Sequence, residues 1–187
     1  YYPGARLLAL KLVVAADDDR ILGAQVVGEE GVDRRIDVIA TAMRAGIRAT
    51  DLQSLELAYA PQFGAAKDPV NMLGYIAEHR AEGEGAIQWH ELDAAVDAGA
   101  WLVDVRGAAQ LDEGTIPGAT WVPVEDLRER MEEFRGRPVV VHCRVGQSAH
   151  TATRLLAAHG IDVVNLDGGY LTWAAAQRAR ALAGTPT

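Results

Sequence analysis

The segment most informative about the fold is Val139-Val140-Val141-His142-Cys143-Arg144-Val145-Gly146-Gln147-Ser148. Three successive valines after Pro138 predict a strand that is covered on both faces. From Ala149 to His159 the apolar residues keep helical spacing, and Gly160 is suited to end a helix. The stretch therefore predicts a buried strand, a short loop and a helix, with the only cysteine of the chain at the carboxyl end of the strand.

The position of Cys143 favours sulfur chemistry. It precedes a predicted helix N-terminus, where backbone N–H groups have no intrahelical partner and the helix dipole is positive. Such a site holds an anion, so it would stabilise a thiolate or a persulfide, and Arg144 adds a positive charge. We therefore predict that Cys143 is a catalytic nucleophile. The alternative is that Cys143 is an inert, buried small side chain.

Four motifs, in order along the chain, resemble those of the rhodanese-type sulfurtransferases. They are the segment of residues 143–149, called the cysteine loop below, and Leu102-Val103-Asp104-Val105-Arg106, Gly114-Thr115-Ile116-Pro117-Gly118-Ala119, and Leu166-Asp167-Gly168-Gly169-Tyr170 with Trp173. Thr115 stands where the family usually has histidine. Four ordered motifs over about a hundred residues are a specific signal for the fold.

The resemblance implies roles for the residues of these motifs. Cys143 would carry sulfur as a persulfide, and the rest of the loop would bind substrate: Arg144, Val145, Gly146, Gln147, Ser148 and Ala149. Asp104 and Arg106 are expected to form an ion pair that orients the loop. Many active loops of the family have arginine where this chain has Ser148, which supplies a hydrogen bond but no charge for an anion such as thiosulfate. Arg144 is either an anion contact or a solvated surface charge.

The neighbouring residues argue against other chemistries at this site. Phosphatases of related fold have His-Cys, five further residues and then an arginine that binds phosphate. Ala149 occupies that arginine position, which argues against a phosphate ester substrate. His142 is expected on the strand and His150 within the helix, so we expect packing or exposure for both rather than acid–base roles. We predict no metal site.

Composition sets the class of protein. Of the 187 residues, 49% are apolar and 24% charged, as in ordinary globular proteins. The net charge is −8, and neither half is basic, which argues against a nucleic-acid partner. A single cysteine forms no internal disulfide, which fits the cytoplasm. The sequence has no apolar run long enough to cross a membrane and no signal-peptide pattern.

The second half of the chain alternates strands and helices, which predicts an α/β fold with a parallel sheet covered on both sides. The expected elements are a helix from Trp89 to Gly99, strands at Trp101–Val105 and Thr120–Val122, a helix at Glu125–Phe134, the cysteine-loop strand and helix, a strand at Val163–Asn165, and a helix from Gly169. A polar, glycine-rich linker is expected before them at Glu78–Ala86. Sheets of this kind bind ligands at the carboxyl ends of their strands, where Cys143 is expected.

The first half predicts a separate α+β domain. Strand patterns at Arg6–Ala16 and Ile21–Val27 flank a turn and indicate an antiparallel hairpin. A helix is expected from Gly31 to about Ala45, and its apolar stripe would consist of Ile36, Ile39, Ala40 and Met43. Asp68-Pro69 predicts the N-cap and first residue of a further helix that ends near His79.

Three segments of this half resemble the dimerisation domain of FAD-dependent pyridine nucleotide-disulfide oxidoreductases. They are Gly23-Ala24-Gln25-Val26-Val27-Gly28, Gly31-Val32-Asp33-Arg34-Arg35-Ile36-Asp37 and Leu57 to Asn71. The order of this domain and a rhodanese domain is similar to that of coenzyme A-disulfide reductases with a rhodanese fusion, a branch linked to reduction of coenzyme A disulfide, coenzyme A persulfide or polysulfide. The resemblance implies domains at 1–82 and 83–187, with a homodimer formed through the first.

The same resemblance assigns a role to tyrosines of the first half. In those reductases, a tyrosine of the loop matched by Tyr59 and one of the segment matched by Tyr1 or Tyr2 reach across the dimer to the partner's coenzyme A and redox cysteine. Tyr59 is therefore a candidate substrate-binding residue. The alternative is that its ring packs under Pro61 and Phe63.

No Gly-x-Gly-x-x-Gly sequence follows any predicted strand, so we expect no FAD-binding or NAD-binding domain in this chain. The family's redox cysteine also has no counterpart. The sequence starts at Tyr1 without methionine, which indicates either a trimmed chain or the tail of a longer protein. We interpret it as a C-terminal fragment that binds no cofactor alone, with FAD, NAD(P)H and coenzyme A implied for the full-length protein.

Together these features predict that Cys143 takes sulfur from a sulfane sulfur donor and passes it to a low-molecular-weight thiol, within a coenzyme A-disulfide, persulfide or polysulfide reductase. The alternative function is a non-catalytic module, in which residues 1–82 dimerise and an inactive rhodanese domain binds or packs. Ser148 is the feature that favours this alternative.

Overall fold

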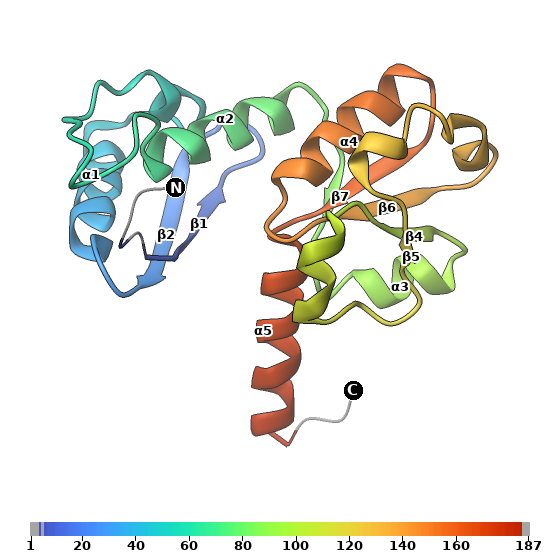
Figure 1. Cartoon of the computed structure of the whole chain (residues 1–187). Coiled ribbons are helices and arrows are strands. Elements are labelled where there is room, and N and C mark those ends of the chain that lie inside the picture. The colour runs from blue at the N-terminus through green and yellow to red at the C-terminus, as the bar shows by residue number, and fades with distance from the viewer. Residues whose placement is uncertain (1–3, 5, 185–187) are drawn as a thin grey trace. The chain divides into compact units, whose positions relative to one another are not determined.

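The computed structural model describes residues 4 and 6–184, and the chain divides between Gly83 and Glu84 into two compact units (Figure 1). This division falls one residue after the boundary predicted at residue 82. The predicted class is confirmed, because an α+β unit precedes an α/β unit with a parallel sheet. Within the described residues, no helix has both the length and the apolarity needed to cross a membrane.

The first unit begins with the predicted hairpin of β1 (Leu8–Val14) and β2 (Ile21–Gly28), which pair antiparallel. Burial alternates along β1, so one face of the hairpin turns to the core. That face packs against α1 (Val32–Ala45). A 3-10 turn, η1 (Thr50–Ser54), and α2 (Pro69–Ala81) complete the unit.

The start of α2 is tied to α1 by a buried ion pair. Asp68 caps α2, as predicted, by accepting the Val70 N–H at 3.0 Å. The same carboxylate accepts a hydrogen bond from Arg35 Nη2 at 2.9 Å, and both side chains are buried. The predicted apolar stripe of α1 is wrong at Ala40, which is exposed, whereas Ala42 is buried because α1 turns its Arg35 face to the core.

The second unit is built on a parallel sheet of five strands in the order β3-β7-β6-β4-β5. The strands are β3 (Ala86–Ile87), β4 (Trp101–Asp104), β5 (Thr120–Trp121), β6 (Val139–His142) and β7 (Val163–Leu166). Side chains of β6 alternate between two cores. Val139 and Val141 lie in one core, and Val140 lies in the other. β6 is therefore the doubly covered strand that the sequence predicts.

Helices cover both faces of this sheet (Figure 1). α4 (Gln147–Ala158) packs in the core of Val139 and Val141. α3 (Leu92–Asp97) and α5 (Gly169–Leu182) pack in the core of Val140. Because β6 and α4 are joined by residues 143–146 alone, the cysteine loop lies at the carboxyl edge of the sheet, as predicted.

The linker expected at Glu78–Ala86 is shorter in the structure. α2 continues to Ala81, and Ala86 already belongs to β3, where it pairs with Asn165 of β7. The prediction was wrong at this end because β3 is only two residues long, and so short a strand has no readable alternation of apolar and polar residues.

The helix expected at Glu125–Phe134 is also wrong. The segment forms two 3-10 turns, η3 (Val124–Asp126) and η4 (Met131–Phe134). Several of its backbone hydrogen bonds span three residues, such as that from the Glu133 N–H to Arg130 O at 3.0 Å. Its buried apolar residues are spaced four and three apart, as they would be in a helix, so spacing alone did not separate the two structures. These residues are Leu127, Met131 and Phe134.

Candidate active site

Cys143 lies directly after β6, and three residues of loop separate it from α4. The side chain is only 3% exposed and lies at the edge of the core between β6 and α4. Its sulfur is not enclosed by hydrocarbon alone, because the Gly146 N–H donates to Cys143 Sγ at 3.2 Å. Gly146 has φ 105°, a conformation that favours glycine and allows the chain to turn from the strand into the helix.

The backbone N–H groups around Cys143 are not used elsewhere. Those of Gln147, Ser148 and Ala149 form the first turn of α4, where no preceding helical carbonyl is available. Together with the N–H groups of Arg144 and Val145, they have no hydrogen-bond acceptor among the residues that the structure describes. The loop therefore offers five further N–H donors beside the one that already contacts the sulfur.

The carbonyl groups of the same loop are held by the segment that starts α5. Tyr170 N–H donates to Cys143 O at 2.9 Å, and Leu171 N–H donates to Arg144 O at 3.0 Å. Because the N–H of a trans peptide points away from its C=O, these two bonds direct the next N–H groups away from α5. A Cβ on Gly169 would lie 2.5 Å from Cys143 O, so glycine is required for this close approach.

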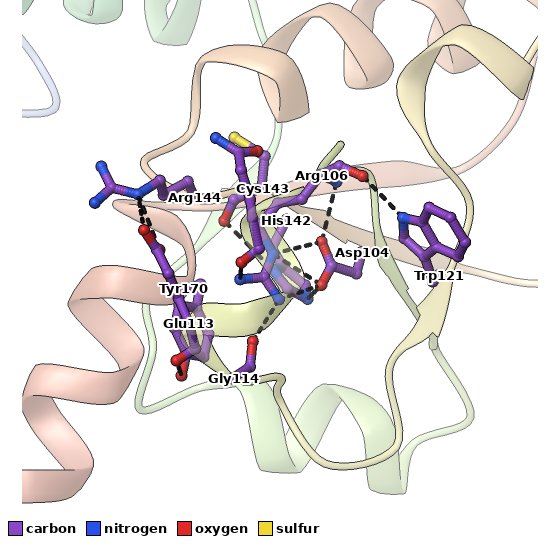
Figure 2. Close-up of polar contacts among 10 residues, drawn as sticks. Asp104, Arg106, Glu113, Gly114, Trp121, His142, Cys143, Arg144 and Tyr170 are labelled. Carbon is purple, nitrogen blue, oxygen red and sulfur yellow. Dashed lines mark hydrogen bonds and ion pairs between the residues drawn. The ribbon is translucent and has the colours of Figure 1, made fainter. Parts of the chain in front are cut away.

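Asp104 and Arg106 form a buried ion pair at the end of β4 (Figure 2). Arg106 Nη2 donates to Asp104 Oδ2 at 2.6 Å and to Gly114 O at 2.8 Å, and Nη1 donates to Gln110 O at 3.0 Å. The guanidinium also lies 4.5 Å from the centre of the Tyr170 ring. The pair therefore reaches the cysteine loop through Tyr170, whose N–H donates to Cys143 O.

His142 is fully buried, in agreement with the packing role expected from its place on a strand. Burial lowers its pKa, although the nearby Asp104 carboxylate acts in the opposite direction. Its Nε2 lies 3.9 Å from Asp104 Oδ2 and has no hydrogen-bond partner among the described residues. The neutral imidazole is thus the form that fits this site.

Arg144 has a partner that the sequence did not indicate. Its Nε donates to both carboxylate oxygens of Glu113, at 2.8 and 2.9 Å. Figure 2 shows the guanidinium turned towards Glu113 and away from the Cys143 sulfur. The ion pair places the Arg144 charge beside a carboxylate at the surface of the unit, and both roles considered for Arg144 stay predictions. Thirty-one residues separate the partners, so no local pattern could have found the pair.

The remaining candidate residues differ in exposure. Val145 and Gln147 are exposed, and Ser148 is half-buried. Ala149 is fully buried, so it can serve a substrate through its N–H only. Among the described residues near the loop, Asn165 was also missed; its Nδ2 lies 3.5 Å from Gly146 O.

Tyr59 lies in the first unit, in an irregular segment between η1 and α2. Its side chain is 55% exposed, and that of Phe63 is 74% exposed. The exposure of both rings argues against the packing alternative for Tyr59 and leaves its substrate-binding role a prediction. Tyr1 and Tyr2 lie outside the described residues.

Two known protein families match the chain. A rhodanese-like domain matches residues 88–176, and a pyridine nucleotide-disulphide oxidoreductase dimerisation domain matches residues 1–69. The fold and the cysteine loop agree with the first match, and the hairpin with its two helices lies within or next to the second. The chain therefore consists of an oxidoreductase dimerisation domain followed by a rhodanese-like domain.

Two solved structures match nearly the whole chain, and a curated protein matches less than half of it. Reduced Bacillus anthracis CoADR-RHD is 41% identical with a TM-score of 0.92, over 96% of this chain and 33% of that one. A NAD-dependent persulfide reductase from A. fulgidus is 35% identical with a TM-score of 0.82, over 92% of this chain and 31% of that one. Coenzyme A disulfide reductase of Staphylococcus aureus (strain bovine RF122 / ET3-1) is 44% identical over 78 residues, which are 42% of this chain and 18% of the relative.

These matches confirm the resemblance drawn from the sequence. The chain corresponds to the C-terminal region of a coenzyme A-disulfide reductase-type oxidoreductase, with its dimerisation and rhodanese-like domains. It spans about a third of the length of the two matched structures and about a fifth of the curated relative.

Proposed function

We propose that the second unit carries sulfane sulfur as a persulfide on Cys143 and passes it to a low-molecular-weight thiol. Coenzyme A is the proposed acceptor, because a curated relative of the chain is a coenzyme A disulfide reductase. Within the whole protein, this module would supply or exchange sulfur for the reduction of a coenzyme A disulfide, persulfide or polysulfide.

Two sulfur exchanges make up the proposed reaction. The Cys143 thiolate attacks the outer sulfur of the donor, and the donor's sulfur–sulfur bond breaks as the new one forms. The leaving group departs with the bonding electron pair, as sulfite from thiosulfate or as the parent thiol from an organic hydropersulfide. The acceptor thiol then attacks the terminal sulfur, leaves as a hydropersulfide and returns Cys143 to the thiolate. No external oxidant or reductant is consumed.

One observation supports this proposal above the others. The Gly146 N–H contacts Cys143 Sγ at 3.2 Å, and the further N–H groups of residues 144, 145 and 147–149 have no acceptor among the described residues. Donors fixed in the backbone stabilise negative charge on sulfur without reorganising during the reaction. A persulfide extends the cysteine by one atom, and we expect these donors to bind it.

Intact mass spectrometry tests the proposal. After treatment with thiosulfate or polysulfide, the chain should gain one sulfur atom, which a thiol such as coenzyme A should then remove. Cys143→Ser should gain none. A parent chain that gains no sulfur from either donor would contradict the mechanism.

We also propose a homodimer formed through residues 1–82, on the basis of the dimerisation-domain match and the exposed apolar side chains of the first unit. A cytoplasmic location is part of the proposal, since the thiol of Cys143 must stay reduced to act. The residues described here do not fit FAD or NAD(P)H, because no strand–helix junction of the parallel sheet has the Gly-x-Gly-x-x-Gly sequence that a dinucleotide requires. We therefore assign both cofactors to the rest of the full-length protein.

A non-catalytic binding module is the second candidate function. The burial of Cys143, the lack of charge at Ser148 and the pairing of Arg144 with Glu113 favour it. Alkylation with iodoacetamide separates the two functions. A thiol active in sulfur transfer reacts faster than a free cysteine at neutral pH, whereas an inert buried thiol reacts only as fast as the unit unfolds.

A further inference from the structure

The basic side chains that the structure describes at the cysteine loop each lie beside a carboxylate. Residues 143–149 contain one basic side chain, Arg144, and Glu113 neutralises it. Arg106, beneath the loop, is matched by Asp104. His150, in the first turn of α4, lies with its Nδ1 2.9 Å from Glu84 Oε1. Attraction for an anion at Cys143 is therefore left to backbone N–H groups.

Of these pairs, only the one between Arg144 and Glu113 has both side chains partly exposed, at 32% and 36%. Asp104 and Arg106 are buried, and Glu84 beside His150 is 9% exposed. Glu113 is nevertheless held in place, because it ends η2 (Ala108–Glu113) and its carbonyl accepts the Tyr170 hydroxyl at 2.6 Å. The main chain of Glu113 is thus fixed, and both oxygens of its carboxylate accept hydrogen bonds from Arg144 Nε.

Sulfur donors differ in the charge that they bring to the thiolate. Attack on thiosulfate gathers three negative charges at the loop, two from the donor and one from the cysteine. Attack on an organic persulfide gathers one or two, depending on its protonation. With the charge of Arg144 neutralised by Glu113, repulsion grows with the donor's charge. A donor with two charges on a small group is therefore the least favoured.

We propose that Glu113 is a specificity-determining residue, which holds the only cation of the cysteine loop and so disfavours small dianionic sulfur donors. Removing its charge would leave Arg144 free to attract such donors. For sulfur donors the inference rests on the function proposed above. The effect of Glu113 on the electrostatic potential at Cys143 does not rest on that function, because the potential can be measured with reagents that transfer no sulfur.

Iodoacetate and iodoacetamide form the matched pair of probes, since they are similar in size and differ in one negative charge. The ratio of their rates at Cys143 reports the local potential and cancels changes in accessibility. In Glu113→Gln, which keeps an oxygen for Arg144 Nε, the ratio of the iodoacetate to the iodoacetamide rate should rise about three- to tenfold at low salt. The increase should shrink in 0.5 M salt, because exposed charges are screened.

Two further variants complete the test. Arg144→Gln leaves Glu113 unpaired, so the ratio should fall, and Arg144→Gln combined with Glu113→Gln should return it to the parent value. Glu133→Gln is the matched control, because Glu133 forms an ion pair of similar exposure with Arg130 in the same unit. It should leave the ratio unchanged.

Thiosulfate provides the second measurement. The rate of sulfur addition to Cys143 should rise in Glu113→Gln more steeply than the iodoacetate ratio, because thiosulfate has two charges. If no variant gains sulfur from any donor, the proposed function fails while the probe ratio still judges the role of Glu113. The inference would be overturned if the ratio of the iodoacetate to the iodoacetamide rate stayed unchanged in Glu113→Gln. It would also be overturned if this ratio did not fall in Arg144→Gln.

Discussion

The two units of the chain bury their apolar side chains to different extents. In the second unit, both faces of the parallel sheet are covered, and few large apolar side chains are exposed. In the first unit, one face of a two-stranded sheet is covered, and many are exposed: Leu7, Val13, Leu22, Val27, Tyr59, Phe63, Met72 and Ile76. The second unit is therefore stabilised by its own core, whereas the first has exposed apolar side chains of the kind that pack against another protein surface.

Both units nevertheless bury an arginine against an aspartate. Arg35 and Asp68 join two helices of the first unit, and Arg106 and Asp104 support the loop region of the second. The second pair is the more enclosed, since Arg106 also donates to two backbone carbonyls. Tryptophan fluorescence can follow the second unit alone, because all four tryptophans follow residue 86.

The largest expected effect is that of Arg106→Met. It leaves Asp104 buried without its partner, which should lower the free energy of unfolding of the second unit by about 3–5 kcal/mol. Urea denaturation followed by tryptophan fluorescence measures this loss. Arg35→Met should instead destabilise the first unit and leave the fluorescence transition in place. Equal shifts of that transition in both variants would show that the units do not unfold separately.

Gly169→Ala should have the next largest effect. The added Cβ would lie 2.5 Å from Cys143 O, and backbone atoms cannot move aside cheaply. We expect a loss of about 1–3 kcal/mol in unfolding free energy and slower alkylation of Cys143. Gly160→Ala is the matched control, since Gly160 also has positive φ but has no atom within 4 Å of the added Cβ. Equal losses in the two variants would show that the whole effect comes from the positive φ of the alanine and not from contact of its Cβ with Cys143 O.

His142 should make the stability of the second unit depend on pH. Burial lowers its pKa in the folded unit below the ordinary value of about 6.5, so below about pH 6.5 the unfolded chain binds a proton that the folded unit does not. Stability is therefore full above that pH and falls below it, by at most about 1.4 kcal/mol per pH unit. His142→Leu should reduce the slope in urea denaturation between pH 5 and 8. His90→Asn, an exposed histidine of the same unit, should not.

The smallest expected effect on folding is that of Val27→Lys. Val27 is 70% exposed, so the free energy of unfolding of the monomer should change by within about 0.5 kcal/mol. If the exposed face of the first unit forms the proposed dimer, sedimentation equilibrium should show the dimer weakened about tenfold or more. Val96→Lys, at an exposed apolar residue of the second unit, is the control. If Val27→Lys and Val96→Lys weaken the dimer equally, or if neither does, the exposed face at Val27 is not the dimer interface.

Local patterns predicted most elements correctly. The hairpin, the capping of α2 by Asp68, and the strand and helix on either side of Cys143 each depend on neighbouring residues. The errors came where local signals are ambiguous. The buried residues of 125–134 have spacings that fit both an α-helix and 3-10 turns, and Ala86 joins the sheet through a two-residue strand.

The candidate site shows the same division. Its location after β6 and its N–H donors follow from a strand that runs into a helix, so the position of Cys143 could be predicted. The orientation of those donors could not, because it depends on hydrogen bonds from Tyr170 and Leu171, which are distant in the sequence. The charge of the loop was also beyond prediction, since it depends on which carboxylate approaches Arg144.

Periodicity and turn residues act over a few neighbours, so they were enough to predict the order of the two domains, the parallel sheet and the edge at which Cys143 lies. The pairing of Glu113 with Arg144 and of Asp68 with Arg35 became visible only in the folded chain. These partners lie 31 and 33 residues apart in the chain. Coulomb attraction and hydrogen bonding depend on distance in space, which the folded backbone sets and the linear sequence does not display.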